Sequence, residues 1–137
     1  MTHMAVPRTR SWILISVCVG LFYALVGILF ALPTTHAKAW RWAAWVVSGL
    51  VYGGHIVYER IRLGSAPVVT ARHVALGAAL GAFGLAVGAN VHSLLVESTS
   101  EQHRLLLLSL VLFPVLTAVP AFVVAFVAAV ALGRMRT

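Results

Sequence analysis

The sequence predicts an all-α integral membrane protein, a single-domain four-helix bundle with four transmembrane helices in up-down-up-down order. Of the 137 residues, 61% are hydrophobic and only 9% are charged, whereas a soluble domain carries about a quarter charged residues. The apolar residues lie in four stretches separated by short polar connections. This composition excludes an ordinary soluble enzyme, a disordered chain and a disulfide-stapled secreted domain.

The spans are predicted at about residues 12–32, 39–62, 71–96 and 101–132, within one domain of residues 1–137. A bilayer core of about 30 Å needs about 20 apolar residues in a helix. The first stretch carries no charge from Trp12 to Leu32, and the fourth carries none between Arg104 and Arg134. Composition alone therefore identifies these two as spans.

The other two stretches contain polar residues. In the third, Asn90 and His92 lie near one end, where the headgroup region can solvate them. The second is the least hydrophobic of the four and includes Arg41. We expect it to need protein neighbours that shield it from lipid, because unpaired polar groups are costly in hydrocarbon.

The connections between the stretches are short and rich in turn-forming residues. They comprise Pro33-Thr34-Thr35, Gly64-Ser65-Ala66-Pro67 and Ser98-Thr99-Ser100-Glu101, the last of which predicts a capping box before the fourth helix. Short links force consecutive helices to run antiparallel, which favours the up-down-up-down bundle and leaves no room for an extramembrane domain.

The basic residues predict the orientation. One side of the membrane would carry seven of them, against three on the other: Arg8, Arg10, Arg60, Arg62, Arg72, Arg134 and Arg136, against Lys38, Arg41 and Arg104. The positive-inside rule then puts both termini in the cytoplasm, in a cytoplasmic (inner) membrane. Because the basic residues are dispersed in ones and twos, we expect no nucleic-acid partner despite the net charge of +7.

Polar residues recur along the second span at alternating spacings of four and three, which places them on one helix face. They are Arg41, Trp45, Ser48, Tyr52, His55, Glu59 and Arg62. Such residues face a bundle interior or a wet cavity, so Ser48, Tyr52, His55 and Glu59 are candidates for a polar path or an ion or proton site. The alternative is structural: Glu59 pairs with Arg60 or Arg62, and His55 bonds to a neighbouring helix.

Two further patterns concern packing and movement. Gly77, Gly81, Gly84 and Gly88 share one face of the third span, which favours close helix association and, as an alternative, a groove for a flat cofactor or lipid. In the fourth span, each of Pro114 and Pro120 removes a backbone donor. These prolines are candidate hinges, although a packed bundle can also simply accommodate them.

Cofactor binding has one candidate. His55 and His73 lie near the cytoplasmic ends of adjacent predicted helices, where they could be the axial ligands of a b-type haem. A metal site is not expected, because no HxxxH or HxH spacing supplies two ligands from one helical turn. Any enzymatic activity would need such a cofactor, since no nucleophile and base set or phosphate loop is present.

Three functions follow, in this order. The first is a subunit that associates with itself or with a larger membrane complex through the glycine face. The second is a small transporter or channel in which Ser48, Tyr52, His55 and Glu59 line the path. The third is a haem-binding electron carrier that uses His55 and His73.

Overall fold

The structure is a computed structural model that describes residues 11–95 and 99–135. Within those residues the chain forms four long helices, α1 (Ser11–Ala31), α2 (Ala37–Val57), α3 (Pro67–Leu95) and α4 (Ser100–Arg134). A single π-helical segment, η1 (Tyr58–Arg62), continues α2. The described part of the chain has no strand, so the all-α prediction is confirmed.

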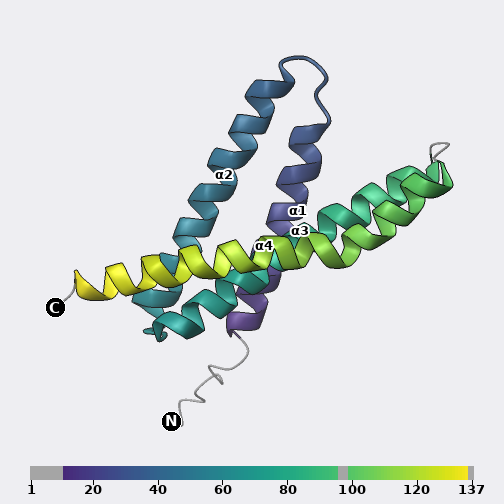
Figure 1. Ribbon diagram of the computed structural model, residues 1–137. Coiled ribbons are helices and arrows are strands. Elements are labelled where there is room, and N and C mark those ends of the chain that lie inside the picture. Colours follow the sequence, from purple (N-terminus) through teal and green to yellow (C-terminus); the bar gives the residue numbers. More distant parts are fainter. Residues whose placement is uncertain (1–10, 96–98, 136–137) are drawn as a thin grey trace, which may run out of the picture.

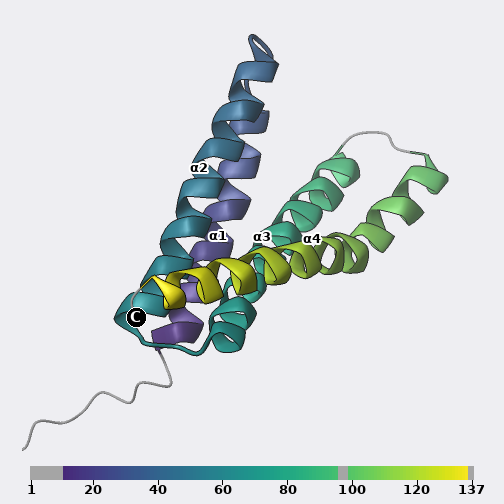
Figure 2. The same cartoon turned by 60° about the vertical axis from the view of Figure 1, so that its left-hand side comes forward.

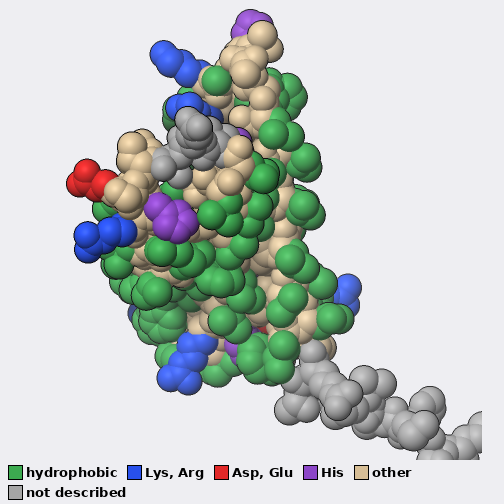
Figure 3. Space-filling model, turned by 90° about the vertical axis from the view of Figure 1, so that its right-hand side faces the viewer, with side chains coloured by type: hydrophobic (Ala, Val, Ile, Leu, Met, Phe, Trp, Pro, Cys, Tyr) green, Lys and Arg blue, Asp and Glu red, His purple; other side chains and the backbone are tan. Residues whose placement is uncertain are grey.

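Three of the helices, α1, α3 and α4, are long and apolar enough to cross a membrane, as expected of an integral membrane protein. The second helix is not among them, and it carries Lys38, Arg41 and His55. Figure 3 shows hydrophobic side chains over most of the face in view, with charged side chains towards its margins. This surface is suited to lipid, which solvates apolar side chains as well as a protein core does.

The observed helix ends differ in detail from the predicted ones. The third helix begins at Pro67, a residue suited to the first helical position because its missing N–H needs no partner there. The capping box of α4 is shifted by one residue, because Thr99 and Gln102 form it, with N–O distances of 3.1 and 3.3 Å. Arg8, Arg10, Val96, Ser98 and Arg136 lie outside the described residues.

The four helices form two antiparallel hairpins, α1–α2 and α3–α4, that cross and diverge (Figure 1). In Figure 2 the hairpins meet at one end and their two turns lie far apart at the other. The end where they meet holds the start of α1, η1, the start of α3 and the end of α4 (Figures 1 and 2). This arrangement differs from the predicted bundle of four helices along one axis.

The divergence begins at the contact between α1 and α3, which is formed by glycines on both helices. A Cβ atom on Gly20 would lie 2.6 Å from the Leu80 Cβ, and one on Gly81 would lie 2.6 Å from the Tyr23 Cβ. Such distances leave room for hydrogen only, so the two backbones approach closely at this point. Small-residue contacts of this kind permit steep crossings, and α2 and α4 are carried apart as a result.

The third and fourth helices are joined by small apolar residues and one amide. Ala71 and Val74 pack with Ala125 and Ala129 in the buried core. Near the other end of the hairpin, the Asn90 amide nitrogen donates to the carbonyls of Ala86 and Leu106, both at 2.8 Å. The second hairpin is therefore fixed at both ends.

Candidate functional site

The centre of the site is the Glu59 carboxylate, which is fully buried where the two hairpins meet. Its Oε1 atom lies 3.1 Å from Nδ1 of His73 and 4.0 Å from Nε2 of His55. Its Oε2 atom accepts a 2.9 Å hydrogen bond from the hydroxyl of Ser65. These partners come from α2, from α3 and from the turn between them, so the cluster forms only when these parts pack together.

The π-helical segment positions this carboxylate. In η1 the Leu63 N–H bonds to the carbonyl of Tyr58, five residues back, and the Ser65 N–H bonds to the carbonyl of Glu59. A π turn is wider than an α turn and is common at functional sites. Here it ends in a tight turn at Gly64, whose φ of 63° suits a residue without a Cβ atom. Ser65 is thereby folded back onto Glu59.

The first helix holds His73 in place from the other side. The indole of Trp12 stacks on the imidazole with ring centroids 4.2 Å apart and planes 4° apart. The Ser16 hydroxyl donates a 3.2 Å hydrogen bond to the His73 carbonyl. The stack and this hydrogen bond together hold His73 beside Glu59.

The cluster pairs a buried acid with two histidines. A buried carboxylate is stable only when it is paired or protonated, and its two ion-pair partners within the described residues are both histidines. Histidine exchanges its proton in the physiological pH range. Neither ring nitrogen of the buried His55 has a hydrogen-bond partner. The arrangement thus places two imidazoles beside a fully buried carboxylate, with His55 buried and His73 partly exposed.

The adjacent arginine has a structural role. The Arg60 Nε donates a 3.1 Å hydrogen bond to the Ala129 carbonyl of α4, and its Nη1 donates a 2.8 Å bond to the Ser65 carbonyl. Arg62 is exposed. No ion pair joins Glu59 to either arginine in the described part of the chain, so the structural pair considered from the sequence is replaced by the two histidines.

Replacing Arg60 with leucine is expected to loosen the end of α4, because the Ala129 carbonyl would lose its side-chain partner. Backbone hydrogen exchange in the last two turns of α4 should rise about tenfold, as expected for a lost contact of about 1.5 kcal/mol with a charged donor. Hydrogen–deuterium exchange with mass spectrometry measures this. The matched control is Arg62→Leu, which removes an exposed arginine from the same element and should leave exchange in α4 unchanged.

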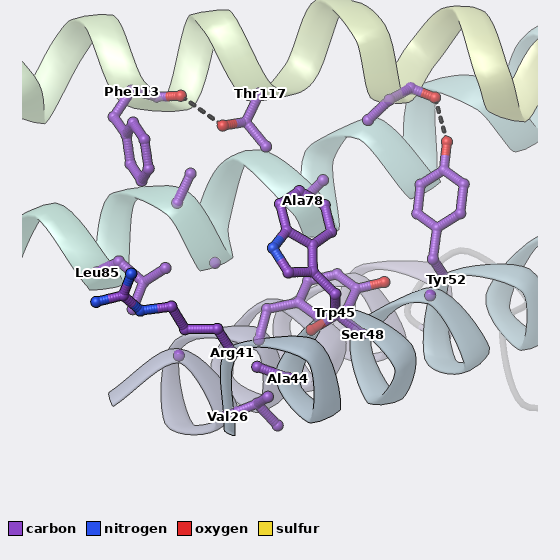
Figure 4. A pocket seen from close by; sticks show the side chains of 16 residues that line it. Val26, Arg41, Ala44, Trp45, Ser48, Tyr52, Ala78, Leu85, Phe113 and Thr117 are labelled. Carbon is purple, nitrogen blue, oxygen red and sulfur yellow. Dashed lines mark hydrogen bonds between the residues drawn. The ribbon is translucent and has the colours of Figure 1, made fainter. Parts of the chain in front are cut away.

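A cavity of about 550 Å³ lies between the diverging hairpins (Figure 4). All four helices contribute to its wall, which is mostly apolar. The Tyr52 hydroxyl crosses from α2 to donate a hydrogen bond to the Ala121 carbonyl of α4. His55 follows Tyr52 by one helical turn and is buried, so the cluster lies just beyond this end of the cavity.

The structure divides the predicted polar path into two parts. Ser48 and Tyr52 line the cavity, whereas His55 and Glu59 belong to the buried cluster. The predicted hinge residues Pro114 and Pro120 lie within α4, which is helical through both. Whether either proline acts as a hinge stays a prediction.

The predicted glycine face of α3 is covered by α1 of the same chain. Cβ atoms on Gly77, Gly81, Gly84 and Gly88 would all lie within 4 Å of atoms of α1. The face is therefore not free to bind a flat cofactor, a lipid or a second protein.

The two candidate haem ligands do lie close together. However, the Glu59 carboxylate is within 4.0 Å of a ring nitrogen of both His55 and His73, and the indole of Trp12 covers one face of the His73 ring. A haem iron must lie between its two axial nitrogens. Because a carboxylate already contacts both imidazoles, the geometry fits an ion-paired cluster better than axial ligation.

Sequence reasoning missed two members of the site. In the sequence Trp12 is only the first residue of an uncharged stretch, and Ser65 is only part of a turn. Trp12 contacts His73 across 61 positions of sequence, and no local pattern reveals such a contact. Ser65 follows Glu59 within a turn marked by Gly64, so a search for hydroxyls beside a buried acid would have found it.

No family model, curated protein or solved structure matches this chain.

Proposed function

We propose that this protein is a small membrane carrier that couples movement of a solute to the protonation of the His55–Glu59–His73 cluster. The proposal is carried by one observation, the fully buried Glu59 carboxylate within 4.0 Å of two histidines at one end of a cavity. Ionisable residues at membrane depth are costly, and those that persist commonly serve as proton relays or lie on substrate pathways.

The location of the cluster supports coupling. It lies where the two hairpins meet, and its members come from α2, η1, α3 and the turn between them. Adding or removing a proton there changes the attraction between those elements. Because the cavity lies between the same hairpins, a small change in their angle would alter access to it. This is how a local charge change moves packed elements between two arrangements.

The membrane arrangement is part of the same proposal. All four helices span the bilayer, and α2 is shielded from lipid by α1 and by the solute bound in the cavity. The positive-inside rule favours cytoplasmic termini in an inner membrane. The cluster then lies near the cytoplasmic side, and the cavity opens towards the outer side between the diverging hairpins.

The test measures the angle between the hairpins as a function of pH. Spin labels on Leu50 of α2 and Leu116 of α4, both exposed, report the distance across the cavity. Cys18 is the sole cysteine, so Cys18→Ala gives a background free of cysteine. Pulsed electron paramagnetic resonance in lipid nanodiscs should show a different distance distribution at pH 5 and at pH 8.

Glu59→Gln should abolish this pH response, because the cluster then lacks its only carboxylate. The matched control is His92→Gln, which removes an exposed histidine from α3 and should keep the response. The titratable groups facing Glu59 are His55 and His73; α1 faces the cluster with Trp12 and Ser16, and α4 with a backbone carbonyl bound by Arg60. If the distance between the two spin labels is the same at both pH values in the protein with an intact cluster, the proposal is refuted.

The complex-associated subunit is not proposed, because α1 occupies the glycine face on which that role depended.

A further inference from the structure

We infer that the cavity binds an amphipathic organic anion of low molecular weight, with its charged head at Arg41 and its apolar body between the hairpins. This inference names the solute class for the proposed function and rests on that function. The volume of about 550 Å³ is within the range of pockets for small organic ligands, about 300–1,000 Å³.

Arg41 supplies the recognition of charge. It is the one charged side chain among the residues that line the cavity, and Figure 4 shows its guanidinium reaching across from α2 towards Leu85 of α3. Within the described residues it makes no ion pair and no hydrogen bond to another side chain. The guanidinium is exposed near the start of α2, where it is accessible to a ligand, and its planar fork matches a carboxylate or sulfonate.

The remaining wall determines the nature of the ligand body. Trp45 and Phe113 come from opposite hairpins (Figure 4). Small residues such as Ala78 and Ala82 also line the cavity. Aromatic and aliphatic walls bind apolar groups through contact area and exclusion of water. A few hydroxyls, among them Ser48 and Thr117, offer limited polar contact. A strongly hydrophilic solute would leave most of this wall without a favourable partner.

The charge distribution selects an anion over a cation. Glu59 is buried about one to two turns beyond Tyr52 along the same helix and is engaged by His55 and His73, and no acid is among the residues that line the cavity. A cationic ligand would therefore meet an unpaired arginine and no accessible carboxylate. An anion pairs with Arg41 at one end, while the proton needed for coupling stays at the other. The two residues are 18 positions apart, a rise of about 27 Å along the helix.

Binding can be tested with two fluorescent probes that differ only in the charged group. The anionic probe is 11-(dansylamino)undecanoate, and its counterpart carries a trimethylammonium group in place of the carboxylate. Titration of the full-length protein in phosphatidylcholine nanodiscs should give saturable dansyl enhancement with the anion. Arg41→Gln should weaken that binding at least tenfold, and Arg41→Lys should restore part of it. The cationic probe should bind weakly and show no loss with Arg41→Gln.

A second pair of variants tests the location. A Cβ atom on Gly49, which lines the cavity, or on Gly54, which does not, would meet no atom within 4 Å. Gly49→Leu should therefore fill the cavity and reduce anion binding at least tenfold, while Gly54→Leu should leave it unchanged. Equal binding of the two probes, or anion binding that is insensitive to both Arg41→Gln and Gly49→Leu, overturns the inference.

Two further measurements distinguish a lipid from a small solute, and the ligand from the carrier function. If phosphatidylglycerol in the nanodisc displaces the anionic probe completely, the occupant is a lipid headgroup and the inference of a small solute is wrong. Glu59→Gln should retain probe binding while losing the pH response of the hairpin distance. If the unmodified protein binds the anion but its hairpin distance does not change with pH, the proposed carrier function is contradicted and the ligand is not. If the hairpin distance changes with pH but the anion does not bind, only the inferred ligand is contradicted.

Discussion

Replacing Glu59 with alanine is expected to lower the free energy of unfolding in detergent by about 3–5 kcal/mol, the usual cost of removing one partner of a buried ion pair. The carboxylate is fully buried, and its loss would leave His55, His73 and Ser65 without the acceptor that they share. Thermal unfolding followed by circular dichroism measures the loss.

Two variants make this result specific. Glu59→Gln keeps the shape of the side chain and an oxygen that can accept from Ser65, so its cost should be nearer to 1–2 kcal/mol, roughly that of one buried polar contact. Glu101→Ala removes an exposed acid from the first turn of α4 and should change stability by less than about 0.5 kcal/mol. If Glu59→Ala behaves like Glu101→Ala, the cluster is not an ion-paired unit.

The second large effect is expected at the helix crossing. Gly81→Ala should destabilise the protein by about 1–3 kcal/mol, the usual cost of overpacking. The added methyl would lie 2.6 Å from the Tyr23 Cβ and 3.2 Å from the Gly20 carbonyl oxygen, neither of which can move without shifting α1. Thermal unfolding in a mild detergent measures the loss. Gly81→Leu should prevent the two helices from meeting and lower the yield of folded protein.

The control variant for this prediction is expected to raise the stability of the protein instead of lowering it. Gly53 lies inside α2, and a Cβ atom there would meet nothing within 4 Å. Alanine is favoured over glycine in a helix interior by about 0.5–1 kcal/mol, so Gly53→Ala should stabilise the protein slightly. The opposite signs separate helix propensity from helix packing. Loss of stability in both variants would mean that the crossing of α1 and α3 is not specially close.

The sequence determined the helices because that information is local. The uncharged and mostly apolar stretch from Trp12 to Leu32 predicts α1, and the observed helix runs over Ser11–Ala31. The spacing of Ser48, Tyr52, His55 and Glu59 placed them on one face, since a helix repeats every 3.6 residues whatever surrounds it. Likewise, the costs of polar groups in lipid indicated that this face had to meet protein or water.

Only the tertiary structure decided what that face meets. His73 of α3 contacts Glu59, and Trp12 of α1 contacts His73, and no periodicity encodes a contact between two helices. The same holds for the cavity: α1 and α3 cross through Gly20 and Gly81, which separates the other two helices. Hydropathy records how much each segment avoids water. The angle at which packed helices cross depends on side-chain shape at the contact, and this angle set both the buried Glu59 cluster and the cavity beside it.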